Sequence, residues 1–109
     1  MSEPTASAGP ARKRLPNRRS SETLSFCCGN FNYVATVSFL PDGSLAEVFL
    51  NNDKAGSDSD SAAKDSAVVA SIALQYGVPL DTIRRALLRD PQGVAASPLG
   101  VVLDLCSQQ

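Results

Sequence analysis

Several of the residue types on which enzyme chemistry depends are missing or scarce. The 109 residues include no His and no Trp, and the aromatic residues are four Phe and two Tyr. Without His, nucleophiles activated by an imidazole and the commonest zinc ligand are excluded. So few aromatic rings also leave little material for stacking nucleic-acid bases. We therefore assign no catalytic residue and no metal ligand from composition.

The sequence also lacks long apolar runs and a regular cysteine pattern. No run approaches the roughly 20 residues that cross a bilayer, and the first 22 residues contain no apolar core typical of a secretory signal. Cys27, Cys28 and Cys106 are odd in number and without metal-type spacing, which favours a reducing compartment. We expect a cytoplasmic, single-domain protein without a membrane segment.

Basic charge is concentrated at the start of the chain. The first 19 residues carry five Lys or Arg side chains against one Glu, although the whole chain has a formal net charge of −1. Proline and glycine interrupt the same segment, so we predict a disordered basic arm over residues 1–20 and one domain over residues 21–107. The arm could contact a partner or nucleic acid weakly, with Arg18 and Arg19 as candidates, or it could only aid solubility.

Residues 22–52 alternate between apolar and polar side chains, as an antiparallel three-stranded meander does. Gly29-Asn30 and Asp42-Gly43 are typical two-residue turns. With those turns, Cys28 faces Phe31 in the first hairpin and Phe39 faces Ala46 in the second. Both hairpins then place their apolar side chains on one face, which consists of Leu24, Phe26, Cys28, Phe31, Tyr33, Ala35, Val37, Phe39, Ala46, Val48 and Leu50.

After residue 52 the apolar period changes from 2 to about 3.6, which predicts helices. The first begins near residues 57–60, ends at Gly77, and carries one apolar stripe at 63, 67, 70 and 74 and another at 69, 72, 73 and 76. The second spans Leu80 to Arg89, with Arg84 and Arg85 pointing outward as candidate partner-binding residues. The third begins at Ser97 and Pro98. The fold class is therefore α+β, a three-stranded meander followed by two or three helices packed on one face.

A polar loop joins the predicted third strand to the first helix and is the candidate ligand site. A strand-to-helix junction gathers backbone N–H groups, which bind anions such as phosphate. The full phosphate-loop pattern is missing and several Asp lie nearby, so a well-capped connection explains the same residues. We retain both interpretations, an anion or nucleotide site and a capped turn, for Asn51, Asn52, Lys54, Gly56 and Ser57.

Four motifs together give a resemblance to a known family. They are Cys28-Gly29-Asn30, Glu47-Val48-Phe49, Lys54-Ala55-Gly56, and Gly77 followed by Pro79. In this order and spacing they resemble the TSCPD-type domain of adenosylcobalamin-dependent (class II) ribonucleoside-diphosphate reductases, which also occurs as short separate proteins. The Thr-Ser-Cys-Pro-Asp string that names the domain is replaced here by residues 96–100, Ala-Ser-Pro-Leu-Gly.

The resemblance implies an accessory or detached domain related to ribonucleotide reduction. Such a domain would dock on a reductase subunit, through a sheet edge or through Arg84 and Arg85, or bind a nucleotide, without radical chemistry of its own. Adenosylcobalamin belongs to the family's catalytic part, so we expect no cofactor in this chain. We expect a monomer or a small homo-oligomer. The alternative from the residues alone is a small nucleic-acid-binding protein that uses its basic arm.

Overall fold

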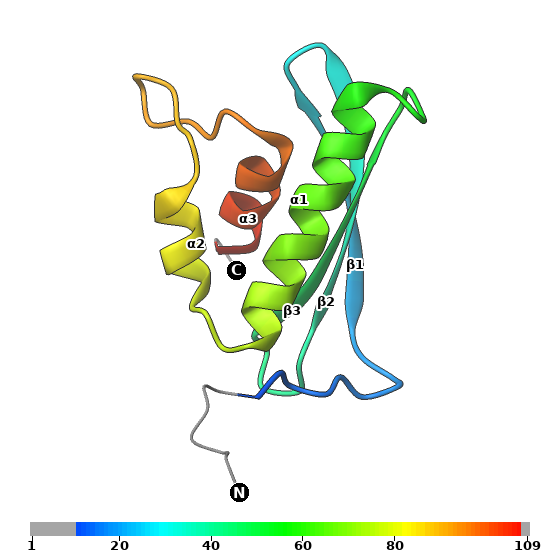
Figure 1. Cartoon of the computed structure of the whole chain (residues 1–109), viewed down its shortest axis with the longest axis vertical. Coiled ribbons are helices and arrows are strands. Elements are labelled where there is room, and N and C mark those ends of the chain that lie inside the picture. The colour runs from blue at the N-terminus through cyan, green and yellow to red at the C-terminus, as the bar shows by residue number, and fades with distance from the viewer. Residues whose placement is uncertain (1–10, 108–109) are drawn as a thin grey trace, which may run out of the picture.

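Three strands and three helices follow one another along the chain in the computed structural model, which describes residues 11–107. The three helices gather on one face of the sheet (Figure 1). The predicted α+β class is therefore confirmed. The elements are β1 (Ser21–Cys28), β2 (Phe31–Phe39), β3 (Leu45–Asn52), α1 (Asp58–Gln75), α2 (Leu80–Ala86) and α3 (Pro98–Ser107).

The first hairpin has the predicted register. β1 and β2 are antiparallel, with Cys28 opposite Phe31 and Phe26 opposite Tyr33. Gly29 has φ +60°, a left-handed conformation that suits glycine in a two-residue turn. The rings of Phe26 and Tyr33 stack with their centroids 5.6 Å apart, so the predicted apolar face begins directly at this turn.

The second hairpin differs from the prediction by one residue. Val37 lies opposite Val48 as expected, but Phe39 pairs with Leu45 and not with Ala46, so the Phe39–Ala46 prediction is wrong. The reason is the turn, because the N–H of Leu40 donates to the carbonyl of Ser44 at 2.8 Å and closes a loop of three residues, 41–43. A three-residue hairpin loop ending in a left-handed glycine commonly produces a bulge, and Gly43 has φ +89°.

The core lies between the sheet and the two longer helices. α1 packs Leu74 and three small residues, Ala63, Ala67 and Ala70, against the sheet, and the small residues let the helix approach closely. α3 buries Leu99, Val102, Leu103 and Cys106 as its spacing predicts. The second apolar stripe of α1 remains largely exposed. Among residues 11–107, no helix is both long and apolar enough to cross a membrane.

α2 is shorter than predicted, and one of the two arginines on its outward face is engaged in ion pairs. It ends at Ala86 and not at Arg89, which instead forms an isolated bridge with Ala95. Arg84 is partly exposed, with 28% of its side chain accessible, and its guanidinium is paired with carboxylates of α2 and α3. Arg85 is exposed as expected.

In the part of the chain that the structure describes, no helix lies over the opposite face of the sheet (Figure 1). Its side chains are mainly polar, but Val34 is 42% exposed and Phe49 is 49% exposed. Phe49 lies opposite Thr36 on β2, and Val34 lies opposite Asn51 on β3. The outer face of the sheet therefore has an apolar centre within a polar surround.

Candidate functional site

The loop from Asn51 to Ser57 joins the end of β3 to the start of α1. Ser57 is the N-cap of α1, and its hydroxyl accepts a hydrogen bond from the N–H of Asp60 at 3.1 Å. The side-chain oxygen of Asn52 accepts a hydrogen bond from the N–H of Lys54 at 2.7 Å, which makes a tight Asx-type turn. Gly56 has φ +79°, which glycine adopts without strain.

The carboxylate of Asp60 fills the centre of this loop. Asp60 is only 2% exposed, and its two oxygens accept hydrogen bonds from the N–H groups of Asn52 and Gly56, each at 3.0 Å. The ammonium of Lys64 lies 2.9 Å from the same carboxylate. The hydrogen bonds from Gly56, Lys64 and Asn52 lower the pKa of Asp60 to about 2. An internal anion thus occupies the N–H groups that an external phosphate would use.

The five candidate ligand-binding residues take different positions around this carboxylate. Asn52, Gly56 and Ser57 belong to the hydrogen-bonded turn, whereas Asn51 and Lys54 are exposed. The side-chain nitrogen of Asn52 is buried, and among residues 11–107 it has no hydrogen-bond partner. The physical arrangement favours a capped connection, and ligand binding at this loop remains a prediction.

Calorimetry tests nucleotide binding at the loop directly. We expect deoxyribonucleoside triphosphates to give no saturable heat with the wild-type chain or with Lys54→Ala, because Asp60 already holds the N–H groups of Asn52 and Gly56. A saturable isotherm that Lys54→Ala weakens would contradict this expectation and establish the loop as a nucleotide site.

The described part of the basic arm, residues 11–20, lies beneath the C-terminal end of α1 and the second hairpin (Figure 1). The N–H of Lys13 donates to the carbonyl of Gln75 at 2.7 Å, and the Nε of Arg12 donates to the side-chain oxygen of Gln75 at 2.6 Å. The N–H of Phe39 donates to the carbonyl of Ser20 at 3.0 Å. The first half of the predicted disordered arm, residues 1–10, lies outside the described residues.

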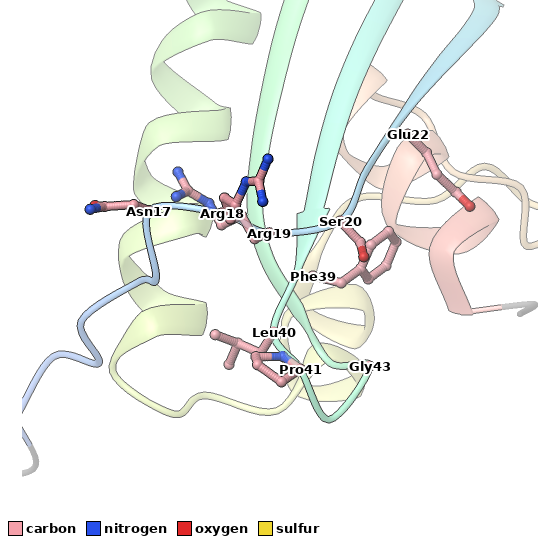
Figure 2. A pocket seen from close by; sticks show the side chains of 9 residues that line it. All are labelled: Asn17, Arg18, Arg19, Ser20, Glu22, Phe39, Leu40, Pro41 and Gly43. Atoms are coloured by element: carbon pink, nitrogen blue, oxygen red, sulfur yellow. The ribbon is translucent and has the colours of Figure 1, made fainter.

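The two arginines proposed from the arm have different environments. Arg19 forms an ion pair with Glu47 at 2.7 Å and donates to the carbonyl of Pro16 at 2.6 Å. Arg18 is exposed. They border a shallow hollow of about 920 Å³ that also includes Phe39 and Pro41 (Figure 2). Figure 2 shows both arginine side chains directed away from Pro41.

The remaining predicted pair, Arg84 and Arg85, lies on α2. As with Arg19 and Arg18, one arginine is paired with carboxylates and the other, Arg85, is exposed. Arg84 contacts Asp104 at 2.9 Å and Asp81 at 2.9 Å. Arg89 adds two hydrogen bonds of 2.8 Å to the same Asp104 carboxylate. The hydrogen bonds from Arg89 and Arg84 lower the pKa of Asp104 to about 2, against the effect of partial burial. Sequence reasoning missed this cluster, because Asp104 is brought to Arg84 and Arg89 only by the packing of α3 on α2.

Of the three cysteine thiols, that of Cys106 is buried, that of Cys28 is partly buried and that of Cys27 is exposed. Burial raises the pKa of Cys106 to about 11 and also raises the pKa of Cys28. Cys27 is exposed on the outer face of the sheet and donates a hydrogen bond to the side-chain oxygen of Asn32 at 2.8 Å. Within residues 11–107, no group of three or more Cys, Asp or Glu is arranged to hold a metal ion.

These features define a small α+β domain with helices on one face of a meander and a strand-to-helix loop closed by its own carboxylate. Comparison with known sequences then gives the family: the chain belongs to the TSCPD domain family, whose model matches residues 4–100. The predicted resemblance is confirmed. No solved structure matches the chain.

Curated relatives carry the name vitamin B12-dependent ribonucleotide reductase. The protein from Streptantibioticus cattleyicolor is 42% identical over 73 residues, which are 67% of this chain and 12% of that protein. The protein from Rhodopirellula baltica is 38% identical over 74 residues, 68% of this chain and 7% of the relative. The protein from Bradyrhizobium diazoefficiens is 34% identical over 70 residues, 64% of this chain and 6% of the relative. The chain thus corresponds to a small part of these relatives.

Proposed function

We propose that this chain is a cytoplasmic accessory module of B12-dependent ribonucleotide reduction, which binds a reductase polypeptide and has no radical chemistry of its own. The observation that carries the proposal is its 42% identity to a segment that makes up only 12% of a named reductase. A domain that forms such a small part of a longer chain has neighbours in that chain. A related domain therefore retains surfaces suited to contact with another polypeptide.

The outer face of the sheet is the surface that best suits this role. Phe49 and Val34 supply half-exposed apolar area at its centre, and Thr36 and Asn51 beside them supply hydrogen-bonding groups. An apolar centre with a polar rim is the usual anatomy of a transient protein interface. The outer edges of β1 and β3 also offer backbone groups for strand addition.

Arg84 is less suited to the contact than the sequence suggested, whereas Arg85 is exposed. The Arg84 guanidinium already has two carboxylate partners, Asp81 and Asp104, so a partner carboxylate would have to compete with them. We therefore assign docking to the outer face of the sheet, with Phe49 as its anchor.

The residues of this chain do not fit a bound cobalamin. The chain contains no His, and a surface hollow of about 920 Å³ is bordered by the arm and the second hairpin, including Arg18, Arg19 and Glu22. Such an open, charged hollow differs from the mostly apolar, enclosing pockets that bind large cofactors. We derive no step through that cofactor in this chain.

The experiment is surface plasmon resonance with a purified B12-dependent ribonucleotide reductase on the chip. We expect the wild-type chain to bind and Phe49→Glu to weaken binding at least about tenfold, because a charge would enter the apolar centre of the contact. The matched control is Val94→Glu, since Val94 is 59% exposed in the loop between α2 and α3. Absence of wild-type binding, or an equal loss in both variants, would contradict the proposal.

A further inference from the structure

The solvent-facing side of α1 is unusually apolar. Val68, Val69, Ile72 and Tyr76 are 53%, 66%, 37% and 44% exposed. At 3.6 residues per turn they lie opposite the buried stripe of the same helix, where a helix covering a sheet normally carries polar side chains. We call these four residues the α1 outer patch. A contiguous exposed patch of this kind marks an interaction surface.

A hollow adjoins the α1 outer patch. It has a volume of about 390 Å³ and lies between α1 and the α2–α3 side, with Val69, Ala73, Ile83 and Leu87 among its walls and Asp65 as its charged border. The α1 outer patch supplies projecting apolar side chains, and the hollow beside it supplies a place to receive them. A surface with both features can be complementary to a second copy of itself, as a twofold interface requires.

The charges around the α1 outer patch are unlike at its two ends. Asp58 and Asp65 are exposed on the N-terminal half of α1, where the one basic side chain, Lys64, is paired with Asp60. Exposed Arg12 and Lys13 lie at its C-terminal end, where both hydrogen-bond Gln75, and Lys13 also lines a hollow with Asp42 of the second hairpin. An antiparallel pair of α1 helices brings the acidic half of each copy toward the basic end of the other. A parallel pair would bring like charges together.

We propose that the α1 outer patch binds a second copy of this chain, with the two α1 helices antiparallel about a twofold axis close to Val69 and Ile72. An 18-residue helix is about 27 Å long and covers only part of the roughly 800 Å² per partner that a stable dimer buries. The association is therefore weak and depends on protein concentration. It involves the face of the molecule opposite the proposed reductase contact and does not depend on that function.

Sedimentation velocity of the full chain tests this dimer from about 10 μM to 1 mM. We expect the wild type to change from monomer to dimer across this range. Val69→Asp should weaken the dimer at least about tenfold, with an unchanged circular dichroism spectrum, because Val69 is exposed and central in the α1 outer patch. Phe49→Glu, on the other side of the sheet, should leave the dimer unchanged.

Charge reversal tests the antiparallel arrangement. Asp65→Lys should weaken the dimer about fivefold, and Asp65→Lys combined with Lys13→Glu should recover most of that loss. Lys13 is chosen because its bond to Gln75 uses the backbone N–H, which the substitution retains, and Lys13→Glu alone is measured beside the double variant because Lys13 also lies near Asp42. A wild type that stays monomeric to 1 mM, a dimer that Val69→Asp leaves unchanged, or a double variant weaker than Asp65→Lys alone would overturn the proposal.

Discussion

Replacing Asp60 by Asn lowers the melting temperature by about 10 °C or more, the largest single-residue effect that we expect outside the apolar core. The carboxylate is buried and accepts hydrogen bonds from the N–H groups of Asn52 and Gly56. An Asn side chain has one oxygen, so its amide nitrogen would face one of these two donors and leave that donor unpaired. The substitution also removes the ion pair with Lys64.

Asp58→Asn is the matched control for this experiment. Asp58 also lies in the first turn of α1 and interacts with the same helix dipole, but it is exposed. Differential scanning calorimetry of both variants should show a change of about 2 °C or less for Asp58→Asn. Equal losses in the two variants would mean that helix-terminal charge, and not the hydrogen bonds of Asp60, stabilises the junction.

The architecture was predictable because two kinds of local signal agree. The Gly29-Asn30 turn fixes the first hairpin, and the alternation of apolar residues then fixes which face of the sheet is buried. The position of the second turn was predicted correctly, but the number of residues in its loop was not. Pro41, Asp42 and Gly43 form a loop of three residues, and the sequence does not distinguish this loop from a two-residue turn with the same composition.

The candidate loop was located from the sequence, but the direction of one side chain decides its chemistry. In the sequence, Asp60 is only one of several acidic residues near the start of a predicted helix. Its carboxylate turns back to bind the N–H groups of Asn52 and Gly56, a contact between the helix and the preceding strand. Residue preferences and spacing predict the helix cap. Only the packed structure shows that the Asp60 carboxylate already accepts the hydrogen bonds that a bound anion would accept.

The exposed stripe of α1 shows a second limit of periodicity. Positions 69, 72, 73 and 76 form a stripe with helical spacing, as the buried positions 63, 67, 70 and 74 do. Apolar periodicity alone cannot say which stripe faces the sheet, because both stripes are apolar. The small alanines decide it, since they let α1 approach the strands closely and leave the bulkier Val69, Ile72 and Tyr76 outside.

Asp104→Asn is expected to lower the melting temperature by about 5 °C near neutral pH. The wild-type carboxylate receives hydrogen bonds from Arg84 and Arg89 and joins α2 and the following loop to α3. An Asn at this position keeps one acceptor oxygen and loses the charge that both guanidinium groups face. The effect is limited because the paired side chains are 23–28% exposed and water screens the ion pairs.

The pH dependence of this difference identifies its cause. The pKa of Asp104 is lowered to about 2 in the folded protein, against about 3.9 in an unfolded chain. A carboxyl group with a lowered pKa stabilises the fold fully above the unfolded value, and this contribution is lost as the pH falls from about 5 toward 2. The melting-temperature difference between wild type and Asp104→Asn should therefore shrink over that range.

Asp81→Asn, which removes the more exposed partner of Arg84, should show a small difference throughout. A difference for Asp104→Asn that is as large at pH 2 as at neutral pH would show that packing, and not the charge of Asp104, holds α2 against α3.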